Sequence, residues 1–155
     1  MCYLRNAIKA VIIEDGRILL IKNVDGHGTY YILPGGGQEA GENSHEALQR
    51  ECKEELGKGA ELEIGDLILV REYVSSHHEF AEEEEEVHQI ELMFKAKLLP
   101  RSDLEGPLEP DSRQVGLEWV PLSSLVEVRI YPKILAEILP RLDEYNGPVY
   151  LGDIN

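Results

Sequence analysis

The segment from Pro34 to Lys58, PGGGQEAGENSHEALQRECKEELGK, constrains this chain more than any other. It places three glycines behind a proline and then sets several glutamates in a helical pattern. Consecutive glycines lose much backbone entropy on folding, and clustered carboxylates repel one another. A short segment that combines both unfavourable features indicates a loop and a helix that carry out chemistry.

The second half of this segment predicts a helix from about Ser44 to Leu56. Asn43 is a suitable N-cap residue, and Glu46 follows it at the spacing of a capping box. Gly57 comes directly after the last apolar residue of the pattern, where glycine commonly ends a helix. We therefore expect a helix with well-defined ends.

Three glutamates of this helix are expected to share one face. Glu51, Glu54 and Glu55 stand at positions i, i+3 and i+4, so they converge beside the apolar stripe that contains Leu48 and Cys52. A solvated acidic surface is the simpler interpretation, but carboxylates held against the protein body need a counter-charge. Hard oxygen ligands suit Mg²⁺ or Mn²⁺, and the helix offers no arrangement of His and Cys that favours zinc.

The glycines before the helix predict a loop with unusual backbone conformations. Pro34 ends a strand, and Gly35, Gly36 and Gly37 allow a backbone carbonyl to approach the same metal closely. No Gly-Lys-Ser/Thr follows, which excludes a Walker A loop. The G-x-G-x-x-G spacing of dinucleotide-binding loops does not fit from Gly35 either.

The rest of the chain predicts strands on both sides of this helix and a second helix near the end. A hairpin is expected around Asp15-Gly16. Exposed loops are expected over residues 75–86 and 100–114, and the turn-rich last stretch is expected to dock on the surface or fray. The remaining expected elements are strands at residues 28–33, 60–74, 87–99 and 115–120 and a helix within 131–142.

The composition of the chain limits the classes of ligand and the cellular location that we expect. The 155 residues carry a formal net charge of −15, which disfavours nonspecific binding to long nucleic acid. The two cysteines suggest no disulfide framework, and a reducing cytoplasmic location fits them best. The N-terminal apolar run meets a turn too early to span a membrane, and it lacks the cleavage site of a signal peptide.

The stretch from Gly36 to Lys58 resembles the Nudix box, G-x5-E-x7-R-E-U-x-E-E-x-G-U, in which U is a bulky apolar residue. Cys52 fills the first U position, and Lys58 replaces the usual apolar residue at the last one. The flanking YYILPGG and LEWVPLSSL also look similar to that family. The residues that match its fixed positions are Gly36, Glu42, Arg50, Glu51, Glu54, Glu55 and Gly57.

The resemblance implies one α/β domain over residues 1–155, an α/β/α sandwich with a mixed sheet. It also implies hydrolysis of a nucleoside diphosphate linked to another group X, with a small nucleotide derivative as substrate. No contact with long nucleic acid or membrane is expected, and a homodimer stays an open alternative. The downstream proline associated with ADP-ribose specificity in this family is absent between Lys58 and Pro100, and X itself is not identified.

The resemblance also implies the roles of the residues. Mg²⁺ or Mn²⁺ would be held by Glu51, Glu54, Glu55 and the carbonyl of Gly35. Arg50 would pair with Glu42 and brace the loop against the helix, with Gly36 and Gly57 as structural support. Glu51 or Glu54 is the favoured general base, although some relatives take the base from a loop outside the box. The residues that could serve in that way here are Glu109, Asp111 and Glu118.

Other candidates have simpler interpretations beside them. Arg71 and Arg113 could contact a substrate phosphate, but a surface ion pair is the commoner role. Tyr31 and Tyr73 could stack on a base, but tyrosines in strands usually pack half-buried. The imidazoles of residues 77, 78 and 88 and the acidic run at 81–86 are expected at the surface. A catalytically inactive nucleotide-binding module is the alternative function, and a plain acidic interaction protein is disfavoured by the order of the box.

Overall fold

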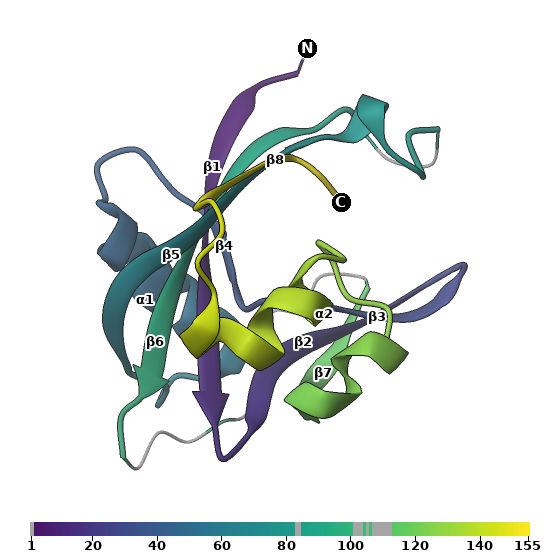
Figure 1. Cartoon of the computed structure of the whole chain (residues 1–155). Helices are drawn as coiled ribbons and strands as arrows, with labels where there is room; N and C mark the ends of the chain where they lie inside the picture. The colour runs from purple at the N-terminus through teal and green to yellow at the C-terminus, as the bar shows by residue number, and fades with distance from the viewer. Residues whose placement is uncertain (1, 83–84, 101–103, 105, 107–112) are drawn as a thin grey trace.

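The computed structural model describes residues 2–82, 85–100, 104, 106 and 113–155. Within them, eight strands form a mixed sheet whose main order is β3-β2-β1-β6-β5-β8, with β4 paired to β1 and β7 paired to β2 (Figure 1). The strands are β1 (Leu4–Glu14), β2 (Arg17–Asp25), β3 (Gly28–Ile32), β4 (Gly35–Gly37), β5 (Leu62–Val74), β6 (His88–Leu98), β7 (Gln114–Pro121) and β8 (Tyr150–Asp153).

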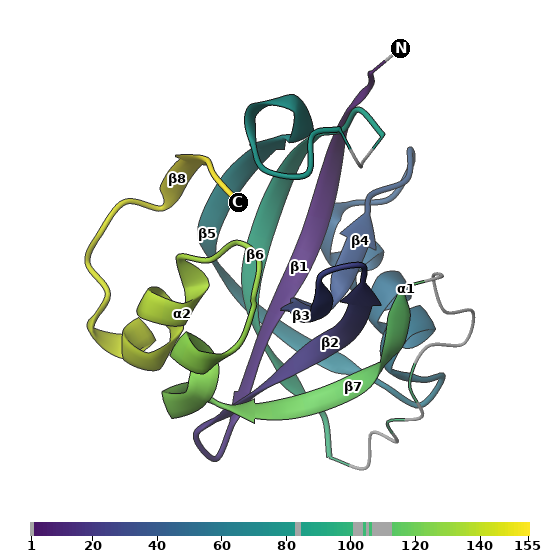
Figure 2. The same ribbon diagram turned by 90° about the vertical axis from the view of Figure 1, so that its right-hand side faces the viewer.

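Helical segments lie on the two sides of this sheet, as Figure 2 shows with α1 to one side and α2 to the other. The expected sandwich with a mixed sheet is therefore confirmed. None of the helices in the described part of the chain is long and apolar enough to cross a membrane. The helical segments are α1 (Ser44–Leu56), η1 (Ser75–His77), η2 (Leu122–Glu127), α2 (Leu135–Ile138) and η3 (Leu139–Glu144).

Strand β1 runs through the middle of the molecule and contributes to two cores. Its alternating side chains reach opposite faces of the sheet. Ile8 and Ile12 pack with the apolar stripe of α1, whereas Val11 packs on the other face against the residues of α2 and η2. The hairpin from β1 to β2 turns at Asp15-Gly16, as expected, and both residues have positive φ.

The glycine run forms a strand, so the prediction of a loop there is wrong. Gly35, Gly36 and Gly37 pair antiparallel with Lys9, Ile8 and Ala7 of β1. The approach is so close that a Cβ on Gly35 would lie 2.0 Å from the carbonyl oxygen of Ile8. Glycine is therefore required here to bring the chain before α1 against the central strand.

The C-terminal region agrees with expectation in part. The predicted second helix is short, because Pro140 cannot donate a backbone hydrogen bond and the chain continues as the 3-10 helix η3. The last stretch docks on the sheet, which is one of the two expected outcomes, since β8 adds to the edge of the sheet in parallel with β5. The loop expected at 100–114 lies mostly outside the described residues.

Candidate active site

The ends of α1 follow from its local sequence. The side-chain oxygen of Asn43 accepts a hydrogen bond of 2.9 Å from the backbone N–H of Glu46, and the Asn43 amide donates to the Glu46 carboxylate at 2.7 Å. Gly57 ends the helix with φ of 128° and donates its N–H to the carbonyl of Lys53. The apolar stripe that includes Leu48 is buried in the core, so the orientation of the helix is fixed.

Arg50 joins the helix to the preceding loop. Its guanidinium donates two hydrogen bonds to the carboxylate of Glu42, at 2.7 and 3.0 Å, and a third of 2.9 Å to the carbonyl of Gly37. The expected pair of Glu42 and Arg50 is thus present. The hydrogen bonds from Arg50 hold the pKa of Glu42 below its ordinary value. Bidentate pairs of this kind fix geometry as well as charge.

The same guanidinium contacts the two glutamates that are proposed as the general base. Nη1 of Arg50 lies 3.0 Å from Glu51 and 3.4 Å from Glu54. The Glu51 side chain is mostly buried, whereas that of Glu54 is about half exposed, at 54%. A Cβ on Gly36 would lie 2.4 Å from Oε2 of Glu51, so the absence of a side chain on Gly36 leaves room for this carboxylate.

Glu55 is the buried member of the set. Its Oε1 accepts a hydrogen bond of 2.9 Å from the backbone N–H of Gly35, which ties the helix directly to β4. Burial raises the pKa of Glu55 to about 7, and the negative charges of Glu51 and Glu54 act in the same direction. The positive charge of Lys9 and the N–H of Gly35 partly oppose this rise.

These carboxylates suit a hard divalent cation in their chemistry and their location. Three carboxylates stand along one side of the helix; Arg50 contacts Glu51 and Glu54, and the charge of Lys9 acts on Glu55. As they stand, however, no three His, Cys, Asp or Glu side chains among the described residues are grouped closely enough to hold a metal ion. Glu51 and Glu54 face Arg50, and Glu55 faces Gly35, so coordination requires side-chain rotation.

The side-chain contacts described for Tyr31 and for the pair of Tyr73 and Arg71 are with residues outside the box. Tyr31 is buried and donates a 2.8 Å hydrogen bond to Glu118, one of the alternative bases, while burial raises the tyrosine pKa to about 12. Tyr73 lies beneath the guanidinium of Arg71. Arg113 is exposed directly before β7. The other alternative bases, at positions 109 and 111, lie outside the described residues.

The prediction of a surface ion pair for Arg71 is wrong, because this residue is only 5% exposed. Its guanidinium pairs with the buried carboxylate of Glu91 on β6 and donates a 2.7 Å hydrogen bond to the carbonyl of Ile154. Burial acts to raise the pKa of Glu91, but the charge of Arg71 and its hydrogen bond hold that pKa below its ordinary value. Arg71 therefore anchors the end of the chain to the sheet.

The predicted surface position of the histidines is largely correct, but each of them has a carboxylate partner. The rings of His77 and His78 each lie 2.6 Å from an oxygen of Asp153, on β8, and His88 lies 3.1 Å from Glu72. Only one histidine, His78, has a mostly buried side chain. These contacts pin the C-terminal strand to the end of β5. The part of the acidic run at 83–84 lies outside the described residues.

Two features were not identified from the sequence. Lys9 is buried behind the glycine strand, where its ammonium lies near the carbonyl oxygens of Leu33 and Gly35. Arg129 pairs bidentately with Asp25 and lies over three aromatic rings. The only local signal for Lys9 is a charged residue that interrupts an apolar strand, and such a residue could equally face solvent.

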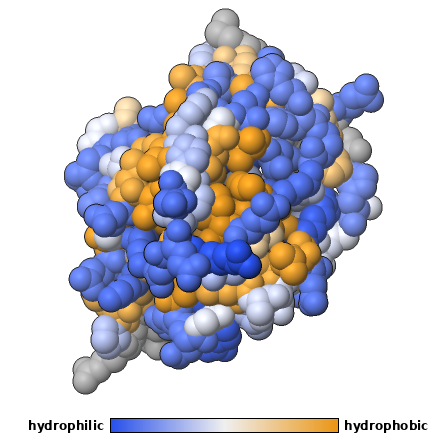
Figure 3. Space-filling model, in the orientation of Figure 1, coloured by the Kyte–Doolittle hydropathy of each residue, from blue (hydrophilic) through white to orange (hydrophobic). Residues whose placement is uncertain are grey.

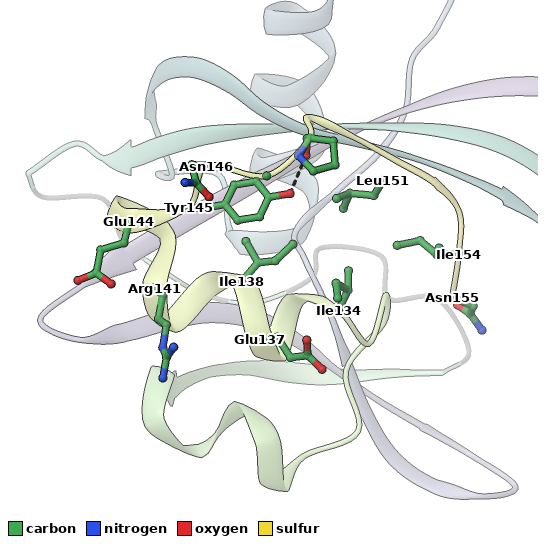
Figure 4. Close-up of a pocket in the computed structure, with 12 residues that line it drawn as sticks. Ile134, Glu137, Ile138, Arg141, Glu144, Tyr145, Asn146, Leu151, Ile154 and Asn155 are labelled. Atoms are coloured by element: carbon green, nitrogen blue, oxygen red, sulfur yellow. Dashed lines mark hydrogen bonds between the residues drawn. The ribbon is translucent and has the colours of Figure 1, made fainter.

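Apolar side chains gather near the middle of the face shown in Figure 3. A cavity of about 770 Å³ lies between α2, η3 and the C-terminal segment (Figure 4). Ile134, Ile138 and Leu151 point into it, while Glu137 and Arg141 stand at its edge. None of the box residues lines this cavity, and it contains no comparable cluster of carboxylates. We therefore place the candidate site at the box and not at this cavity.

Comparison with known proteins shows the family to which the chain belongs. The NUDIX domain model matches residues 3–142. The nucleoside triphosphatase NudI of Salmonella heidelberg (strain SL476) is 36% identical over 101 residues, which cover 58% of this chain and 66% of that protein. The chain thus spans slightly less than two thirds of the length of this curated relative.

Two solved structures share the fold of this chain. A MutT NUDIX hydrolase from Burkholderia pseudomallei superimposes with a TM-score of 0.64 at 30% identity, over 86% of this chain and 95% of that one. A NUDIX hydrolase from Nitrosomonas europaea, at 19% identity and a TM-score of 0.66, shares the fold over 95% of this chain and 94% of its own. With a family model that covers most of its length, this chain belongs to the Nudix family.

Proposed function

We propose that this chain is a metal-dependent pyrophosphohydrolase that acts on a nucleoside diphosphate linked to another group. The observation that carries the proposal is the linked set of Arg50, Glu51, Glu54 and Glu55 at the spacing of the Nudix box. A plain acidic surface would not require a bidentate arginine or a glycine that leaves room for a carboxylate. The name of NudI makes nucleoside triphosphates the first candidates for the substrate.

Mg²⁺ or Mn²⁺, when bound, supplies positive charge that polarises phosphoryl oxygens and lowers the pKa of a water molecule. The residues that would hold it are Glu51, Glu54, Glu55 and the carbonyl of Gly35. Glu54 is the exposed member of the set, so it can rotate toward an attacking water and accept its proton. Arg50, through its own anchor on Glu42, would keep the loop braced against the helix while Glu51 and Glu54 turn from the guanidinium toward the metal.

The test is a screen of nucleoside triphosphates, dinucleoside polyphosphates and nucleotide sugars with Mg²⁺, in which phosphate and pyrophosphate release are measured. We expect hydrolysis of at least one class, and loss of that hydrolysis in excess EDTA. Binding of a nucleotide without turnover across the whole screen would support the inactive binding module instead. Full activity after dialysis against EDTA would contradict the proposed metal.

A further inference from the structure

Lys9 is a buried cation on the central strand, although lysine side chains are seldom buried without partners. Only 9% of the residue is exposed. Its ammonium lies 3.4 Å from the carbonyl oxygen of Leu33 and 3.5 Å from that of Gly35, on the two sides of Pro34. The chain therefore directs a positive charge at the carbonyl group that is expected to bind a metal.

Two buried carboxylates lie within the influence of this ammonium. Glu55 comes from α1, and Glu91 comes from β6, which is the parallel neighbour of β1. The charge of Lys9 acts to lower the pKa of both groups. Arg71 also contacts Glu91, whereas Lys9 is the positively charged side chain that acts to lower the pKa of Glu55.

A divalent cation on the Gly35 carbonyl would meet this charge at short range. Mg²⁺ binds oxygen at about 2.1 Å. Since Nζ of Lys9 lies 3.5 Å from the same oxygen, the two cations would be less than about 6 Å apart. Like charges at that separation repel appreciably even with the screening of bulk water. The ammonium and the metal are thus alternatives at this carbonyl.

We propose that Lys9 is a resident counter-cation of the site, which competes with the divalent metal for the Gly35 carbonyl and keeps the metal affinity of the free protein low. This inference rests on the proposed function, because it takes Gly35 and Glu55 as metal ligands. Lys9 would be a positioning residue that neutralises Glu55 while no metal is present. It would move away from Gly35 when the metal binds.

The experiment measures Mn²⁺ binding by electron paramagnetic resonance, without any nucleotide. Lys9→Met keeps the length of the side chain and removes its charge, so we expect Mn²⁺ to bind at least about tenfold more tightly than to the wild type. Lys9→Arg keeps the charge and should stay near the wild type. Lys95→Met is the matched control, because it removes the same charge from an exposed site on β6. Equal affinities for Lys9→Met and Lys95→Met would overturn the proposal.

A second measurement needs no variant and covers the case in which Lys9→Met does not fold. The side-chain amino groups of ¹⁵N-labelled wild type are observed by NMR. Saturating Mg²⁺ should speed the exchange of the Lys9 ammonium protons with water, because their carbonyl partner is lost. Unchanged slow exchange would refute competition. Neither measurement uses a substrate. Metal-dependent hydrolysis together with no effect of Lys9 on metal binding would refute only this inference. An effect of Lys9 on metal binding in a protein that hydrolyses no nucleotide would refute only the proposed function.

Discussion

Two charge clusters of this molecule are assembled in opposite ways. The box cluster joins Arg50 to Glu42, Glu51 and Glu54, all of which lie within thirteen consecutive positions of the sequence. Helix periodicity and one cap decide its geometry. Its carboxylates are partly accessible, since the side-chain exposure ranges from 14% at Glu42 to 54% at Glu54.

The C-terminal cluster collects its members from three distant segments of the chain. They are Arg71, Glu91, His77, His78 and Asp153. Its ion pairs hold β8 and the last residues against β5 and β6. The core of the cluster, formed by Arg71 and Glu91, is almost completely buried. The difference teaches how exposure separates the two clusters: we propose the accessible one for chemistry, whereas the buried pair of the other attaches the C-terminal segment to the sheet.

The largest effect should come from the box cluster. Glu54→Gln keeps the size of the side chain and removes its charge, so turnover should fall by about 10²–10⁴-fold, which is the contribution of a positioned base. The measurement is kcat on the substrate found by the screen. Glu127→Gln, which removes the same charge from an exposed position on η2, should leave kcat nearly unchanged. Similar small effects from both would reduce the box glutamates to surface charge.

A change in the C-terminal cluster should instead act on stability. Arg71→Met leaves the carboxylate of Glu91 buried without its partner, so the free energy of unfolding should fall by about 3–5 kcal/mol. Urea denaturation measures the change. Replacing both residues, as in Arg71→Met with Glu91→Leu, should recover much of the loss. A single-variant loss that the double replacement does not reduce would mean that the pair is not the cause.

The same contrast explains what could be predicted from the sequence. The bounds Ser44–Leu56 are correct because Asn43 and Gly57 mark them locally, and the pairing of Glu42 with Arg50 follows the box spacing. The roles of the box glutamates in metal binding and catalysis stay predictions. Local patterns such as these are decided within a few turns of chain.

The missed features depend on register between distant strands. Arg71 faces Glu91 only because β5 and β6 pair in one particular register, in which these two residues are direct partners. Lys9 reaches the carbonyl of Gly35 only because the glycine strand pairs with β1. No spacing along the sequence shows either pairing. A charged residue in an apolar strand could have suggested a buried partner, but not which one.

The pH dependence of stability should distinguish Glu55, which lies beside the box cluster on α1, from the members of that cluster. Its pKa is about 7 in the folded protein and near 4.5 in the unfolded chain, so the folded state favours the protonated form. The free energy of unfolding of the metal-free protein should therefore decrease as the pH rises from 5 to 8, by about 3 kcal/mol in total. Glu55→Gln should flatten this decrease. Urea denaturation in EDTA at several pH values measures it, and parallel curves for wild type and variant would contradict the assignment.

The smallest effect is expected for Asp153, at the exposed edge of the C-terminal cluster. Burial acts to raise its pKa, but the hydrogen bonds from His78 and His77 hold it well below its ordinary value. The folded state thus favours the ionised form, and this stability is present at neutral pH and lost as the pH falls below 4. Because the carboxylate is partly exposed, Asp153→Asn should lower the free energy of unfolding by no more than about 1 kcal/mol at pH 7.

Thermal unfolding at pH 7 and in strong acid checks this prediction. The difference between wild type and Asp153→Asn should shrink in acid, where the wild-type carboxylate is also neutral. Turnover of the variant should equal that of the wild type, since none of the contacts described for Asp153 involves a box residue. A loss of turnover as large as that expected for Glu54→Gln would show that the C-terminal strand takes part in catalysis, and the division between an accessible catalytic cluster and a buried attachment cluster would then fail.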